Sequence, residues 1–194
     1  MIQRVRFELD HSRYLSIVVT VVAALALYAG SVTPGTRAVE TGAFVVEHEL
    51  VLPGAPETIY DAITGDISEW WDHSFRVSPK KFYIEAKPGG GFWEIFDDSG
   101  DGVLHATVIY AERGKLLRFD GPLGLSGKAI QMVHTYEFAR VGTDSTRLKL
   151  SVHASGEIEP GQAEKVDGAW LHFLAEQFKP YIESGRHLDR NKRN

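Results

Sequence analysis

The chain has 194 residues, of which 43% are hydrophobic and 24% charged, and it contains no cysteine. This balance is typical of one packed domain with a short additional segment, and the lack of thiols excludes disulfides, thiolate metal sites and a cysteine nucleophile. Acidic residues number 26 against 21 basic ones, a formal net charge of −5, which argues against a nucleic-acid partner.

Residues 14–29 form an uncharged apolar run that comes after three arginines, Arg4, Arg6 and Arg13. A basic segment before an apolar run is typical of a secretory signal or a membrane anchor. As a helix the run would span roughly 24 Å, short of the ~30 Å hydrocarbon core unless residues 30–33 extend it. We therefore predict that residues 1–38 are a cleaved signal peptide or an N-terminal anchor. A buried core helix is the alternative, but apolar positions occupy every face of this run instead of one stripe.

The flanking charge of this segment predicts where the rest of the chain lies. Basic residues before an apolar span stay on the cytoplasmic side of a membrane, so the residues after the span emerge on the other side. The sequence thus predicts a periplasmic or otherwise extracytoplasmic domain, either secreted or anchored to the inner membrane by residues 14–33. Pro34 and Gly35 break any helix, and we expect a linker over residues 39–43 before a folded domain over residues 44–184.

Apolar and polar residues alternate over residues 44–52, which predicts a first β-strand. A Pro-Gly pair ends it, and a short helix is expected over residues 56–63 because proline suits the first helical turn. A second short helix over residues 66–71 can be capped by Asp66. Period-two alternation and frequent turns then predict an antiparallel meander. Its strands are expected at about 76–79, 81–87, 91–97, 102–111, 115–120 and 129–140, with a seventh at 145–154.

Apolar residues recur every three or four positions from residues 160–163 to residues 184–185, which predicts a long amphipathic helix. Pro180 should bend or end it, because proline lacks the amide hydrogen that an interior position donates. Residues 185–194 are expected to be a flexible basic tail. The meander and the helix can both bury their apolar faces if the sheet curls around the helix. The sequence therefore predicts an α+β helix-grip fold with an apolar cavity between helix and sheet.

Several short phrases occur in a characteristic order along the chain. They are residues 52–64 with Trp70 and Trp71, residues 89–93, residues 113–119, and residues 167–170. In this order they resemble the SRPBCC or START-like superfamily, also called Bet v-like, and within it the branch named after the activator of heat-shock protein 90 ATPase homologue. The resemblance covers residues 44–184 and implies the helix-grip fold and its cavity. It does not imply one chemistry, because the superfamily includes ligand carriers, aromatic cyclases, co-chaperone domains and hydrolase-like members.

Aromatic and aliphatic side chains of the domain are candidates to line the cavity, although most of them equally suit a core. They are Trp71, Phe82, Phe92, Phe96, Phe119, Tyr136, Phe138, Trp170, Phe173 and Leu174. Leu123 and Leu125 lie in a glycine-rich loop where polar residues would be usual. By the resemblance this loop could be a lid at the cavity mouth; the alternative is simple packing against the helix end.

Three histidines, His105, His134 and His153, fall on separate predicted strands, and a solvent-facing position is the simpler expectation for them. If His105 or His134 points inward with Glu94, general acid–base chemistry becomes available in the cavity. No nucleophile elbow and no dinucleotide-binding loop supports a particular reaction. The candidate catalytic residues are therefore His105, His134 and Glu94.

Metal and cofactor motifs are weak in this sequence. Residues 97–102 resemble the first half of a calcium loop, but Val108 stands where the bidentate glutamate belongs, so a hairpin turn explains them. None of the eight histidines forms a short ligand motif. We expect no metal site and no cofactor.

These observations favour an extracytoplasmic domain that binds or transports a hydrophobic small molecule or lipid, rather than an enzyme. Membrane contact is expected through the N-terminal segment if that segment is not cleaved. The alternative is a cyclase, isomerase or hydrolase that uses histidine and glutamate side chains of the cavity. A co-chaperone role is the third possibility, and it conflicts with export because that chaperone is cytosolic.

Overall fold

The computed structural model describes residues 35–190, and residues 1–34 and 191–194 lie outside the described part. The chain divides into two compact units, Met1–Ala38 and Val39–Asn194, and the second unit contains the folded domain. The predicted signal peptide or anchor therefore falls almost wholly outside the described residues. Among the residues described, no helix combines the length and the apolar character needed to cross a membrane.

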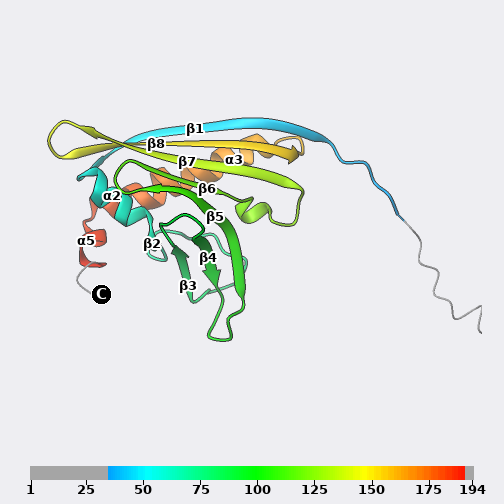
Figure 1. The fold of residues 1–194 in the computed structure, drawn as a ribbon, viewed down its shortest axis with the longest axis horizontal. Helices are drawn as coiled ribbons and strands as arrows, with labels where there is room; N and C mark the ends of the chain where they lie inside the picture. The colour runs from blue at the N-terminus through cyan, green and yellow to red at the C-terminus, as the bar shows by residue number, and fades with distance from the viewer. Residues whose placement is uncertain (1–34, 191–194) are drawn as a thin grey trace, which may run out of the picture. The chain divides into compact units, whose positions relative to one another are not determined.

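Within the described residues, one curved antiparallel sheet forms the frame of the folded unit, in the order β1-β8-β7-β6-β5-β4-β3-β2 (Figure 1). Its strands are β1 (Thr41–Pro53), β2 (Gly65–Asp66), β3 (Lys81–Ile84), β4 (Gly91–Ile95), β5 (Gly102–Glu112), β6 (Leu116–Asp120), β7 (Ile130–Val141) and β8 (Ser145–Glu157). The last strand, β8, is antiparallel to the first, β1, and the two pair along their whole lengths. This pairing places the start of β1 beside the end of β8.

Alternating burial along the long strands shows which face of the sheet carries the core. In β8, Leu148, Leu150 and Val152 are fully buried while the residues between them are partly exposed. This is the period-two pattern of a sheet with one covered face. Figure 1 shows the C-terminal helix lying along one face of the sheet. The α+β arrangement is consistent with the predicted helix-grip fold.

The C-terminal helix is continuous from residue 162 to residue 183 but changes its winding. It consists of α3 (Gln162–Leu171), the π-helix η2 (His172–Phe178) and α4 (Lys179–Glu183). The Lys179 amide bonds to the Leu174 carbonyl, five residues back, as in a π-helix. Pro180 has no amide hydrogen to continue that series. Pro180 does not end the helix, which continues to Glu183; the winding changes just before it, between η2 and α4.

Aromatic side chains hold this helix against the segment that precedes β3. Trp71 stacks on Phe173 with ring centroids 3.9 Å apart and planes 10° from parallel. Trp70 packs against Phe178 at 4.9 Å. Aromatic pairs of this kind contribute about 0.5–1.5 kcal/mol beyond the apolar area they bury. The Trp-Trp pair therefore fixes residues 70–71 on the helix, and with them the loop that comes next.

Two short elements near the start of the domain differ from the expectation. The helix α2 (Pro56–Ile63) is present, but the second helix predicted over residues 66–71 is only a turn, which Asp66 caps by accepting a hydrogen bond from the Ser68 amide at 3.1 Å. The strand predicted at residues 76–79 is wrong. In that loop a side chain accepts a backbone hydrogen bond that a strand would make with its neighbour: the Arg76 amide donates to Ser74 Oγ at 2.9 Å. The eighth strand of the sheet is instead β2.

The boundaries of the domain also extend beyond those predicted. β1 begins at Thr41, inside the stretch expected to be a linker, because Thr41 pairs with Glu157 at the end of β8. Residues 186–190 form a helix, α5 (Arg186–Arg190), where a flexible tail was expected. Its His187 is buried and its ring lies 6.1 Å from that of Tyr181. This contact explains why these residues fold back onto the domain.

Candidate functional site

A pocket of about 390 Å³ lies between the C-terminal helix and the sheet. Its walls come from Trp71, from residues 73–75, from His105 of β5, from residues 122–125, from Met132 of β7 and from the helix. Helix residues that line it include Val166, Ala169, Trp170 and Phe173. The volume lies in the range of small-molecule sites, and the lining is mostly apolar with a few polar groups, which is the usual composition of such sites.

The structure separates the predicted cavity residues into three groups. Trp71, Trp170 and Phe173 line the pocket. Six others are buried in the core without lining it: Phe82, Phe92, Phe119, Tyr136, Phe138 and Leu174. Phe96 is only partly buried, and the Arg76 guanidinium lies over its ring at 4.9 Å. The pocket thus occupies one end of a larger aromatic core, a division that alternation along the strands cannot reveal.

Leu123 and Leu125, the predicted lid residues, both line the pocket. They bound a short 3-10 turn, η1 (Leu123–Leu125). Leu123 is buried and has a φ of 48°, a left-handed conformation that is unfavourable for a bulky side chain. A backbone held in this region costs on the order of 1–3 kcal/mol and persists only where surrounding contacts fix it. The turn is therefore positioned by its contacts at the pocket.

Glu94 and His105, two of the three predicted catalytic residues, meet at the pocket wall. Both side chains are buried, and His105 Nε2 donates a hydrogen bond to Glu94 Oε2 at 3.1 Å. The other carboxylate oxygen accepts bonds from the Ser74 hydroxyl and from the Phe75 amide, the latter at 3.0 Å. Every oxygen of the buried carboxylate is thus satisfied, as a buried charge requires.

The second ring nitrogen of His105, Nδ1, makes no hydrogen bond within this network. Nδ1 is buried and has no hydrogen-bond partner of good geometry within the described residues. The nearby Leu123 backbone nevertheless acts to raise the pKa of the ring. Burial lowers the pKa of His105, and the hydrogen bond and the charge of Glu94 oppose that effect. In the neutral imidazole Nε2 carries the proton, because the Glu94 carboxylate accepts a hydrogen bond at that nitrogen.

His134, the third predicted catalytic residue, lies in the core and does not line the pocket. Its Nε2 donates to the Gly121 carbonyl at 3.1 Å, and its ring stacks on Phe119. Burial lowers the pKa of His134 to about 4. The expectation of solvent-facing histidines is wrong for His105 and His134, whose side chains face the covered side of the sheet, and only His153 of the three is exposed.

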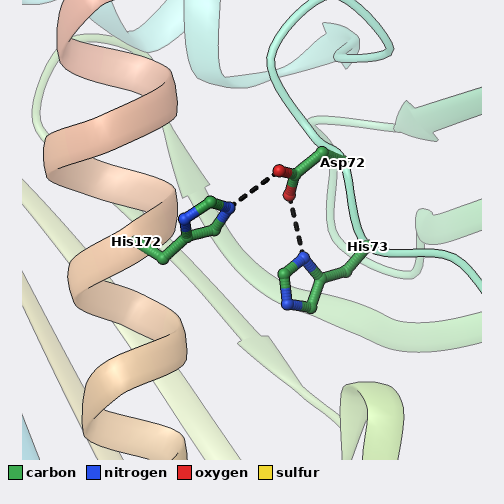
Figure 2. A group of neighbouring side chains, drawn as sticks. All are labelled: Asp72, His73 and His172. Carbon is green, nitrogen blue, oxygen red and sulfur yellow. Dashed lines mark hydrogen bonds and ion pairs between the residues drawn. The ribbon is translucent and has the colours of Figure 1, made fainter.

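A second polar cluster stands at the rim of the pocket, where Asp72, His73 and His172 converge from two segments 100 residues apart (Figure 2). Asp72 accepts hydrogen bonds from His73 Nδ1 at 2.8 Å and from His172 Nε2 at 2.7 Å. His172 Nδ1 bonds in turn to Glu176 at 2.8 Å. His73 also lines the pocket.

The charges of this rim cluster support one another. The bonds to Glu176 and Asp72 raise the pKa of His172. Partial burial alone would raise the pKa of Asp72, but its hydrogen bonds with His73 and His172 outweigh that effect and lower the pKa. The sequence patterns do not predict this cluster, because no short motif joins the residues. Two features of the sequence could have indicated it: His172 stands beside Phe173 on the predicted helix, and an Asp-His pair comes directly after Trp71.

The fold resembles solved structures whose sequences are distant. It matches a protein of unknown function from Staphylococcus aureus with a TM-score of 0.57 and 18% identity, covering 80% of this chain and 99% of that one. It also matches an uncharacterized protein from Rhizobium leguminosarum with a TM-score of 0.53 and 13% identity, covering 76% of this chain and 99% of that one. These likenesses show the fold alone.

The Aha1 dimer from Colwellia psychrerythraea is similar as well, with a TM-score of 0.49 and 17% identity, covering 72% of this chain and 96% of that one. No family model matches the chain, and no curated protein matches it in sequence.

Proposed function

We propose that this domain binds a hydrophobic small molecule or lipid in the pocket between the C-terminal helix and the sheet. The observation that carries the proposal is the mostly apolar 390 Å³ pocket walled by Trp71, Trp170 and Phe173. Burying apolar ligand surface there would contribute about 25 cal/mol per Å² before the entropy costs of binding. His105 and Gln162 are buried polar residues in the apolar wall, so the ligand is expected to carry a polar group on an apolar body.

The proposal can be tested by filling the pocket. Ala169 lines the pocket, whereas Leu171, two residues on, does not line it and is half exposed. The full chain in a non-ionic amphipol would be titrated with a dansyl-labelled fatty acid, and the bound probe would then be competed with a library of lipids and aromatic compounds. We expect Ala169→Trp to weaken probe binding at least ~10-fold, because the indole takes the ligand's place.

Leu171→Trp is the matched control, since it adds an indole to the same helix outside the pocket. Circular dichroism of both variants would establish that the helix and the sheet persist. Equal probe affinity of the wild-type chain and Ala169→Trp would refute binding at this site.

An enzyme of the cyclase, isomerase or hydrolase kind is the second candidate, and the Glu94–His105 pair favours it. His105 is oriented by Glu94 and lines the pocket, so Nδ1 would be the general base in such a reaction. Turnover of p-nitrophenyl acyl esters that fit the pocket would be compared in the wild-type chain and in His105→Gln. Turnover that the substitution leaves unchanged would exclude this role for His105.

The location of the domain is a separate proposal. Residues 14–29 are apolar and uncharged and come after three arginines, a pattern that supports export across the inner membrane. A fusion of residues 1–38 to alkaline phosphatase should be active, because that enzyme matures only after export. An inactive fusion that accumulates in the cytoplasm would contradict the extracytoplasmic location.

A further inference from the structure

We propose that Asp72, His73 and His172 form a binding site for a divalent first-row transition-metal ion, with zinc as the ion to test, at the rim of the pocket. Imidazole nitrogens and a carboxylate oxygen are ligands that such ions prefer. The proposal is independent of what the pocket binds.

The distances between the ligand atoms suit an ion. One donor atom from each of the three residues lies within 4.8 Å of the other two. Donors bound at about 2.0–2.2 Å from one zinc ion lie at most roughly 4.4 Å apart. The three atoms are therefore within a few tenths of an ångström of the largest spacing that one ion allows.

The two segments that supply the ligands are held together by a rigid contact. Asp72 comes directly after Trp71, and His172 directly precedes Phe173. The rings of Trp71 and Phe173 stack at 3.9 Å with planes 10° from parallel. The fold thus fixes the loop and the helix beside each other at the ligands, so binding an ion requires little ordering of the chain.

Glu176 supplies the outer contact that metal-binding histidines commonly have. Its carboxylate accepts the Nδ1 hydrogen of His172 at 2.8 Å, which directs Nε2 toward Asp72 (Figure 2). A carboxylate behind a ligating histidine fixes the tautomer and raises the basicity of the other nitrogen. In the wider winding of η2, His172 and Glu176 still meet as neighbours on one side of the helix.

Access and coordination number are also suitable. The side chains of Asp72, His73 and His172 are 43%, 58% and 28% exposed, so an ion can reach them from solvent. Three protein ligands leave one position of a tetrahedral ion for water. The site is therefore expected to be of the open kind rather than a closed structural centre.

The test is titration of the full chain with Zn²⁺ in a non-ionic detergent and without a histidine tag, and then Co²⁺ substitution. We expect one saturable equivalent of Zn²⁺ and a visible Co²⁺ spectrum of low-symmetry four-coordination. Glu176→Gln should weaken Zn²⁺ about 10–100-fold, the usual cost of losing an outer contact. His73→Gln and His172→Gln should weaken it further and abolish the Co²⁺ spectrum.

His153→Gln is the matched control, because His153 is exposed on β8 and outside the cluster. It should retain the full equivalent and the spectrum. Circular dichroism checks that each variant is folded. Absence of saturable binding by the wild-type chain, or an equivalent and a spectrum that survive in His73→Gln and His172→Gln, would overturn the proposal.

Discussion

Two buried histidines show how strongly the role of a residue depends on its partner. His105 and His134 both face the covered side of the sheet, on β5 and β7. His134 bonds to a backbone carbonyl and is enclosed by aromatic rings, so it serves the core. His105 bonds to a carboxylate and reaches the pocket. The sequence pattern treats the two alike, because strand alternation reports the face and not the neighbours.

The buried His134 should make the stability of the domain depend on pH. Its pKa is about 4 in the folded state against about 6.5 when unfolded. Between these values the unfolded chain binds more protons, so stability is full above pH 6.5 and falls as the pH drops toward 4. The loss is about 3 kcal/mol, since one pKa unit corresponds to about 1.4 kcal/mol.

Urea unfolding between pH 4 and pH 7 measures this slope. His134→Gln should be less stable at pH 7 but should show a flatter pH dependence, whereas His153→Gln, an exposed position, should keep the wild-type slope. A slope in His134→Gln as steep as in the wild-type chain would show that another group causes it.

Glu94 should be important for stability as well as for the pocket. Its carboxylate accepts bonds from Ser74, Phe75 and His105. Glu94→Ala would remove the acceptor of the Phe75 amide and of His105 Nε2, whereas the Ser74 hydroxyl would keep its bond to the Arg76 carbonyl. Leaving a buried donor without an acceptor typically costs about 1–3 kcal/mol. We expect a loss of that size in urea unfolding at pH 7. Glu137→Ala, which removes an exposed carboxylate from β7, is the control, and an equal small loss in both variants would contradict this expectation.

At the scale of elements, the sequence predicted the long strands and the C-terminal helix, because their apolar periods are long. It failed at short elements, where a few side-chain hydrogen bonds decide the structure. The strand expected at residues 76–79 is a loop, since Ser74 and Glu94 supply acceptors that a strand would take from its neighbour. α5 was missed because burial of His187 depends on Tyr181, which lies earlier in the chain.

Gly121, directly after β6, packs closely against the backbone of β5 beside His105. A Cβ there would lie 2.4 Å from Ala106 Cα and from the His105 carbonyl oxygen, both of them backbone atoms. Gly121→Ala should therefore destabilise the domain by about 1–3 kcal/mol, as overpacking does. Gly124→Ala is the control in the same loop, because a Cβ at Gly124 meets no atom within 4 Å. Thermal unfolding of both variants checks this, and equal melting temperatures would contradict it.

At the scale of the whole molecule, the pocket depends on how sheet and helix enclose space, which no residue pattern contains. The sequence indicated that a helix covers the sheet, and this much of the site was predictable. It did not indicate that Phe82, Phe92 and Phe119 fill one part of the interior and leave the other open. The polar neighbours of the pocket were equally hidden, because Asp72 and His172 meet only in the folded chain.

Ligand binding should stabilise the whole domain, because a ligand that binds only the folded state shifts the unfolding equilibrium. At a free concentration of about 100 times Kd the gain is about 2.7 kcal/mol. For a chain of this size that corresponds to a rise of roughly 5–10 °C in Tm. Calorimetry with the dansyl-labelled fatty acid should show this rise in the wild-type chain and not in Ala169→Trp. An identical shift in both would place the ligand elsewhere.

The four consecutive residues Asp72, His73, Ser74 and Phe75 divide their contacts between two polar groups. The first two belong to the cluster at the pocket rim, and the last two bond to Glu94 at the wall. A displacement of residues 72–75 would therefore change the contacts of the rim cluster and of Glu94 together. We expect an ion at the rim to alter the bonds of Ser74 and Phe75 to Glu94, and through Glu94 the orientation of the buried His105 imidazole.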